Sequence, residues 1–149
     1  MVHRHHYAEL EENRGLELRS VVGELASNLR ATAPERAQGI GITLEIDPFL
    51  ANQDTAIAVA FLLTELIELA ISTTPAAQIR ISVKPGEEEG RAVLRVSSPA
   101  LVDSPELSSL LENRYGRIMG GLARQLRTKL HHDPLVGAFE ASFAVTGRP

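Results

Sequence analysis

The chain has 149 residues, of which 44% are hydrophobic and 4% aromatic, with no cysteine and a formal net charge of −4 at pH 7. This length holds one domain with an aliphatic core rather than two domains. The missing cysteines exclude disulfides, thiolate nucleophiles and cysteine zinc sites, and the negative charge argues against nucleic-acid binding, which needs concentrated positive charge.

The first half of the chain predicts two helices and a strand. Residues 1–14 are polar and irregular, and an apolar pattern at helical spacing over 15–31 predicts the first helix. Alternating isoleucines and Leu44 predict a half-buried strand that ends before Pro48. A helix over 55–73, capped by Asp54, is apolar on most sides and should be largely buried.

The second half predicts a hairpin, two helices and a last strand. Alternating strands over 78–84 and 91–97 flank the turn sequence "PGEEEG". Ser104 should cap a short helix, and a longer helix is expected over 117–130, before a strand over 138–145. This order predicts an α+β fold, a two-layer sandwich in which helices pack on one face of a mixed sheet.

No signal peptide opens the chain, and no apolar run is expected to approach the ~20 residues of a membrane span. We therefore expect a cytoplasmic domain, and no membrane contact by this segment. The chain can be a complete protein or a fragment of a longer, membrane-attached one, and its composition fits either.

The stretch "AFLLTELIELAIS" carries a family resemblance. It resembles the Asn-Glu-x-x-x-Asn-Ala helix in the ATP-binding (catalytic) domain of two-component sensor histidine kinases, in the ATPase superfamily of gyrase, Hsp90 and MutL. Thr64 stands at the first Asn, Glu65 matches the Glu, Leu69 stands at the second Asn and Ala70 matches the Ala. The resemblance covers residues 15–146, so we interpret 15–149 as this domain, and it implies a site for ATP and Mg²⁺.

Two departures argue against that nucleotide site. The second Asn of the family holds magnesium, whereas Leu69 has no oxygen to offer a hard cation. The family's Asp-x-Gly-x-Gly loop is replaced by "VSSPALVD". Ser97 or Ser98 stands near the Asp, which in the family accepts the adenine amino group, and Pro99 and Leu101 stand where glycines belong. Proline removes a backbone N–H donor and restricts φ.

The glycine-rich helix that should cradle phosphates is also altered. "YGRIMGG" keeps Gly116, Gly120 and Gly121 without a phosphate-loop spacing, and close packing on the sheet or inherited loop geometry would explain the paired glycines. We therefore predict a degenerate member that neither binds nor hydrolyses ATP. In it, Glu65 is a relic that faces a small polar pocket or pairs with an arginine. The alternative is a catalytic role for Glu65.

Two histidine clusters admit functional interpretations. "HRHH" (His3, Arg4, His5, His6) is similar to the His-Arg signature of a phospho-accepting dimerisation helix, and residues 1–14 would then be the end of that helix. The simpler interpretation is a solvated chain end. "HHD" (residues 131–133) is either a metal site or, more simply, a turn before Pro134.

The predicted last helix is the most basic part of the chain, with Arg114, Arg117, Arg124, Arg127 and Lys129. Arg117, Arg124 and Arg127 are expected near one face of this helix. They form a solvated helix face or a docking surface for an acidic partner such as a response-regulator receiver domain.

Three hypotheses follow for function. The first is a pseudo-ATPase module of two-component signalling. It would be part of a sensor kinase or of a phosphorelay histidine phosphotransferase, binding a receiver domain, a kinase dimerisation domain or a second copy of itself. The second is an active kinase ATP-binding domain with diverged motifs, and the third is an anti-sigma-type switch, which needs intact nucleotide motifs.

Overall fold

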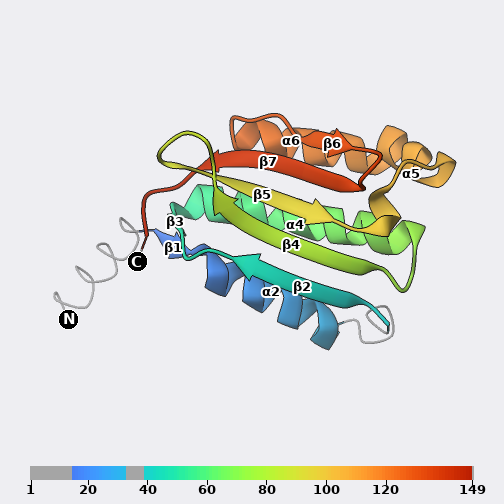
Figure 1. Ribbon diagram of the computed structural model, residues 1–149, viewed down its shortest axis with the longest axis horizontal. Coiled ribbons are helices and arrows are strands. Elements are labelled where there is room, and N and C mark those ends of the chain that lie inside the picture. The colour runs from blue at the N-terminus through green and yellow to red at the C-terminus, as the bar shows by residue number, and fades with distance from the viewer. Residues whose placement is uncertain (1–14, 33–38, 149) are drawn as a thin grey trace.

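The computed structural model describes residues 15–32 and 39–148, which form a β-sheet and a layer of helices that covers one of its faces (Figure 1). The predicted α+β class, a two-layer sandwich with a mixed sheet, is confirmed. The predictions made for residues 1–14, including the HRHH cluster, lie outside the described residues.

The sheet has five strands in the order β2-β4-β5-β7-β6. Its strands are β2 (Gly41–Ile46), β4 (Gln78–Pro85), β5 (Arg91–Ser97), β7 (Ala138–Ala144) and β6 (His131–Asp133). β2 lies parallel to β4, and the other pairings in this sheet are antiparallel. The β4–β5 pair is the predicted hairpin. A parallel pair needs a crossover connection, which the helix between β2 and β4 provides.

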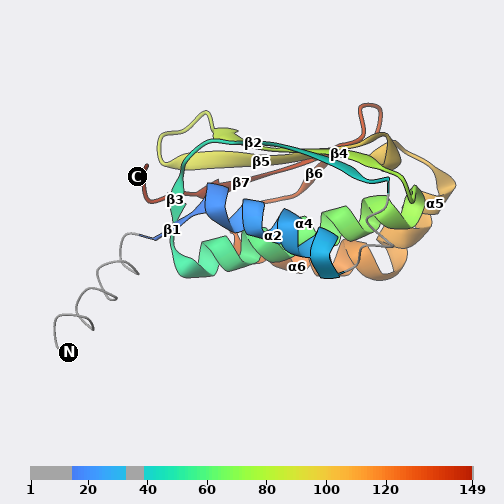
Figure 2. The same ribbon diagram turned by 90° about the horizontal axis from the view of Figure 1, so that it is seen from below.

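Three helices lie side by side against one face of the sheet (Figure 2): α2 (Leu18–Thr32), α4 (Gln53–Thr73) and α6 (Gly116–Gln125). Between β5 and α6 the chain forms a 3-10 helix, η1 (Pro99–Leu101), then α5 (Pro105–Leu110), then a π-helical turn, η2 (Leu111–Tyr115). Ser104 caps α5 as predicted, because its side chain accepts a hydrogen bond from the Leu107 N–H at 3.1 Å.

The helix α4 is the core of the molecule. Ten of its residues are buried, and Leu62, Leu63 and Leu66 are completely inaccessible to solvent. Its 21 residues are long and apolar enough, by length and composition alone, to cross a membrane. The prediction that no apolar run approaches that length is therefore wrong. Half of its most apolar stretch is buried inside the fold, as it is in the core helix of a globular unit, and this length and composition alone do not indicate a span.

Asn52, rather than the predicted Asp54, caps α4. The Asn52 side chain accepts a hydrogen bond from the Thr55 N–H at 2.8 Å, and its own backbone is extended. Asp54 lies in the first helical turn, where its charge still favours the positive end of the helix. The two residue types have nearly equal preference for the cap position, so the sequence pattern does not separate them.

Asn52→Ala is expected to lower the free energy of unfolding by about 1 kcal/mol, because the Thr55 N–H loses its side-chain acceptor. Asp54→Ala removes only a charge near the helix end and should cost about 0.3–0.5 kcal/mol at low salt. Urea denaturation of both variants measures the difference. A larger loss in the Asp54 variant would contradict the assignment of the cap.

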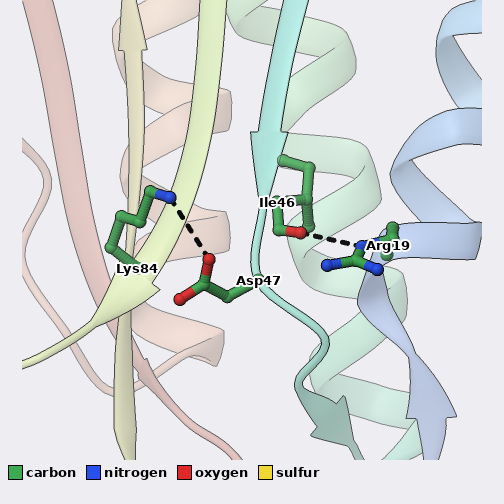
Figure 3. Close-up of polar contacts among 4 residues, drawn as sticks. All are labelled: Arg19, Ile46, Asp47 and Lys84. Atoms are coloured by element: carbon green, nitrogen blue, oxygen red, sulfur yellow. Dashed lines mark hydrogen bonds and ion pairs between the residues drawn. The ribbon is translucent and has the colours of Figure 1, made fainter.

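Polar contacts fasten the end of the edge strand β2 to elements on both of its sides (Figure 3). Arg19 of α2 donates from Nε to the Ile46 carbonyl at 2.9 Å, and Lys84 Nζ of β4 lies 3.2 Å from Asp47 Oδ1. The Lys84–Asp47 pair is solvent-accessible and contributes less than about 1 kcal/mol. The Arg19 bond joins the helical layer directly to the sheet edge.

Two short strands bring the two ends of the described chain together. β1 (Leu16–Glu17) pairs antiparallel with β3 (Leu50–Ala51). Leu50 also exchanges backbone hydrogen bonds with residues near the carboxyl end: its N–H donates to the Gly147 carbonyl, and its carbonyl accepts from the Thr146 N–H, both at 2.7 Å. The segment around β3 therefore holds both ends of the described chain.

Three predicted boundaries are wrong. The first helix begins at Leu18 rather than at 15, because residues 16–17 form β1. The helix predicted over 117–130 ends at Gln125, and Arg127 has a φ of 55°, in the left-handed region. Residues 131–133, predicted as a turn, form the strand β6, and the turn follows it. A three-residue strand is too short to show an alternating pattern.

Candidate functional site

The middle of α4 carries the residues that match the kinase motif. Thr64 Oγ1 donates to the Ala60 carbonyl at 2.9 Å, so this hydroxyl is used within the helix. Glu65 has a buried oxygen, Oε2, with no hydrogen-bond partner, and the described residues supply it with no ion pair. The expected arginine partner of Glu65 is thus not found in the described part of the chain. Leu69 is 0% exposed and belongs to the hydrophobic core.

The segment after β5 is closed by hydrogen bonds. Ser97 ends the strand, and Ser98, only 4% exposed, begins η1 by accepting from the Ala100 N–H at 3.2 Å. Thr73, at the end of α4, donates to the Ala100 carbonyl at 2.9 Å. Leu101 is completely buried. The backbone of this segment is therefore joined to α4 and is not an open loop.

The HHD motif has a structural role through His132. Its Nε2 lies 2.8 Å from the Leu101 carbonyl, and this nitrogen must carry the hydrogen because a carbonyl only accepts. The ring stacks on Phe139 with centroids 4.2 Å apart. Asp133 Oδ1 accepts from the N–H groups of Leu135 and Val136 and so shapes the turn. Within the described ranges, no group of three or more His, Asp or Glu side chains is placed to hold a metal ion.

Gly116 is required by the π-helical turn η2. Its N–H donates to the Leu111 carbonyl, five residues back, which is the hydrogen bond of a π-helix. A Cβ on Gly116 would lie against that same carbonyl oxygen. The Tyr115 hydroxyl, beside it, lies 3.3 Å from Ser72 Oγ and links the turn to α4. This glycine is therefore explained by local packing without any phosphate.

The helix α6 presents the paired glycines Gly120 and Gly121 to open space and two of its arginines to solvent. A Cβ on Gly120 would meet no atom within 4 Å, and one on Gly121 would meet only the end of Arg124 at 4.0 Å, so close packing on the sheet does not explain them. Arg117 and Arg124 are exposed on α6. Arg127 follows the helix end and does not share their face as predicted, because the chain has already left the helix there.

Two hollows lie at opposite ends of α4. One, of about 480 Å³, lies where the end of α4 meets η1 and α5, and its lining contains Asp103 and Glu106 but no arginine or lysine. The other, of about 770 Å³, lies at the start of α4, beside the ends of α6 and β7, and contains Arg91 and Arg127 with one acid, Asp54. Anions are repelled at the first hollow and attracted at the second.

Solved structures with this arrangement are histidine kinases. The Erythrobacter litoralis EL346 blue-light activated histidine kinase matches with a TM-score of 0.71 and 14% identity, over 88% of this chain and 46% of that one. The Acinetobacter baumannii histidine kinase AdeS matches with a TM-score of 0.67 and 13% identity, over 89% and 66%. The catalytic domain of histidine kinase ThkA matches with a TM-score of 0.64 and 14% identity, over 89% and 97%.

The chain has the fold of a histidine kinase catalytic domain. It spans about half of the EL346 chain but nearly the whole ThkA catalytic domain. At identities of 13–14% the likeness concerns the fold alone. No protein-family model matches the sequence, and no curated protein matches it.

The residues of this histidine kinase fold do not fit a magnesium–triphosphate group at the position that the resemblance implies. Magnesium would lie beside residue 69, where Leu69 is aliphatic and completely buried. The Ser98 hydroxyl is used by the Ala100 N–H, and the hollow between the end of α4 and η1 is lined by Asp103 and Glu106 rather than by cations. Only the unpartnered Oε2 of Glu65 has the character of a ligand.

Three side chains on the surface of this histidine kinase fold cannot be identified as site residues from the sequence: Arg91, Ile57 and Phe61. Arg91 lines the larger hollow with Arg127, although the two are on different elements, and no sequence spacing connects them. Ile57 and Phe61 are 43% and 59% exposed on α4. The sequence pattern does not single them out, because a helix that is apolar on most sides gives no sign of which residues face solvent.

Proposed function

We propose that this domain is a non-catalytic, pseudo-ATPase module of two-component signal transduction that acts in the cytoplasm by binding other proteins. It would be part of a sensor histidine kinase or of a histidine phosphotransferase. The observation that carries the proposal is the complete burial of Leu69, at the position where the resemblance places the magnesium-holding Asn. A hard divalent cation requires oxygen ligands, and this position supplies none.

Two further observations support the proposal. The segment 98–101 is bonded to Thr73 of α4, and it contains proline and a buried leucine where the resemblance implies glycines that let the backbone approach a ligand. The nearby hollow carries Asp103 and Glu106, whose charges oppose a triphosphate. These changes affect separate contacts, so no single substitution would restore all of them.

Binding is the activity that remains for such a domain. The proposed partners are a response-regulator receiver domain or a kinase dimerisation domain, in a phosphorelay. The solved structures with this fold are named as histidine kinases, and we propose these two classes of partner because of that likeness. A phosphotransfer assay with the complete natural protein and a panel of receiver domains tests which class applies.

Addition of millimolar ATP with Mg²⁺ is expected to leave the melting temperature unchanged, because the magnesium position has no ligand. A nucleotide present at a hundredfold excess over Kd would stabilise the domain by about 2.7 kcal/mol. For a chain of this size that gain corresponds to a rise of roughly 5–11 °C in Tm. Differential scanning fluorimetry with Mg²⁺ alone as the control measures it, and a rise of that size would contradict the proposal.

The alternative function is an active ATP-binding domain with diverged motifs, and the unpartnered Oε2 of Glu65 is the observation that favours it. A buried carboxylate oxygen without a donor is unfavourable unless a ligand or ion supplies one. Under this alternative, Glu65→Gln would abolish autophosphorylation while ATP still raised Tm. Under the pseudo-ATPase proposal, neither the wild type nor the variant autophosphorylates.

A further inference from the structure

The hollow of about 770 Å³ at the start of α4 lies outside the region that the kinase motif marks. Its walls come from the first turns of α4, the first residue of β5, the end of α6 and the last residue of β7. Most of its lining residues are exposed, so it is an open groove rather than an enclosed pocket. An open groove between packed elements is suited to a protein segment more than to a small molecule, which is normally enclosed on most sides.

Charge within this groove is opposite in sign to the net charge of the chain. Arg91 and Arg127 face it together with a single acid, Asp54, while the chain as a whole has a net charge of −4. The Arg91 guanidinium is held by a hydrogen bond of 3.0 Å to Ser142 Oγ. Arg127 is exposed, and the described residues place no carboxylate in an ion pair with it. The groove therefore favours an acidic occupant.

Arg127 occupies a backbone position where glycine is favoured. It follows α6 with a φ of 55°, its N–H donates to the Arg124 carbonyl, and the Thr128 N–H donates to the Ala123 carbonyl, both at 3.0 Å. Helices commonly end in this way with glycine, which has no Cβ to strain the left-handed conformation. Arg127 thus strains the backbone without making an ion pair in the described part of the chain that would compensate.

An exposed apolar strip continues from the groove along α4. Ile57 lines the groove and is 43% exposed, and Phe61, one helical turn later on the same side, is 59% exposed. Phe49, Phe139 and Phe143 are all buried (5%, 3% and 0% exposed), so Phe61 is the exception among the four phenylalanines. Adjacent large apolar side chains in solvent are typical of a docking site.

We propose that this groove docks an acidic segment of a partner protein, with an apolar side chain of that segment on Ile57 and Phe61 and its carboxylates beside Arg91 and Arg127. The proposal rests on the proposed function, because it gives the location of the protein binding proposed there. Charge complementarity determines the class of occupant, and the apolar strip determines that the segment also carries an aliphatic or aromatic residue.

The test measures the affinity of the whole chain for purified receiver domains from the same genome, by isothermal titration at two salt concentrations. Phe61→Ser and Arg127→Gly are each expected to weaken the binding of the cognate receiver at least tenfold. Arg127→Gly should also reduce the salt dependence and leave Tm unchanged or raised, since glycine relieves the left-handed strain. A loss of binding in this variant therefore cannot come from unfolding.

Matched controls are available on other surfaces. Arg117→Ala removes an exposed arginine of α6 that does not line the groove, and Leu135→Ser removes an apolar side chain that is 88% exposed in the turn after β6. Both should bind as the wild type does. If a receiver binds and the groove variants match these controls, the docking site is wrong while the proposed function stands. If no receiver binds the wild type, the docking proposal is overturned, and the proposed function then requires a kinase dimerisation domain as the partner.

Discussion

Leu69→Asn is expected to lower the free energy of unfolding by at least about 3 kcal/mol. Removal of a buried leucine side chain destabilises by about 2–5 kcal/mol, and burial of an amide without hydrogen-bond partners adds about 1–3 kcal/mol. Leu69 is 0% exposed in the same core cluster as Tyr115 and Met119, so water cannot solvate the new amide. Urea denaturation followed by circular dichroism measures the loss.

The same substitution is a test of the site, because it installs the residue that the kinase motif has at this position. Phe61→Asn, on the exposed part of the same helix, is the matched control and should change stability by no more than about 0.5 kcal/mol. If Leu69→Asn were as mild as the control, a polar, solvated space would exist beside residue 69. That result would favour the active-domain alternative.

Gly116→Ala is the second large effect and should lower the free energy of unfolding by about 2 kcal/mol, despite the helical location. An alanine in place of glycine inside a helix normally gains about 1 kcal/mol. Here the added Cβ would lie against the Leu111 carbonyl, which is backbone and cannot move without disrupting the π-helical turn. Forced overpacking costs about 1–3 kcal/mol or more and exceeds that gain.

Gly120→Ala supplies the control four residues later in α6. A Cβ at that position would meet nothing within 4 Å, so only the helix-propensity gain of about 0.5–1 kcal/mol remains. The two substitutions are chemically identical and should shift the urea midpoint in opposite directions. Stabilisation by both would show that η2 relaxes to an ordinary α-helix at no cost.

The parts of the fold that sequence predicts are those where one strong pattern dominates. The buried helix α4 follows from an apolar run of helical length, and the β4–β5 hairpin follows from two alternating strands around a turn. The Ser104 cap follows from a serine before Pro105, at the first helical position. In each case local pattern and tertiary packing favour the same structure.

Other features depend on contacts that spacing does not encode. β6 is three residues long and exists because it pairs with β7, and α6 ends early because Arg127 adopts a left-handed conformation that arginine rarely does. The groove that contains Arg91 and Arg127 joins the start of one strand to the end of a helix. The family motif in α4 is recognisable in the sequence, but the complete burial of Leu69 depends on how the helices pack.

The short strand β3 holds the two ends of the described chain next to each other. Leu50 lies opposite Glu17 in the β1 pairing and exchanges backbone hydrogen bonds with residues 146–147, so the two ends of the described chain meet at one corner (Figure 1). Proteins with adjacent ends commonly tolerate circular permutation, with new ends at an exposed turn such as 86–90. Domains fused at the two ends of the described chain would thus both attach at the corner formed by β3.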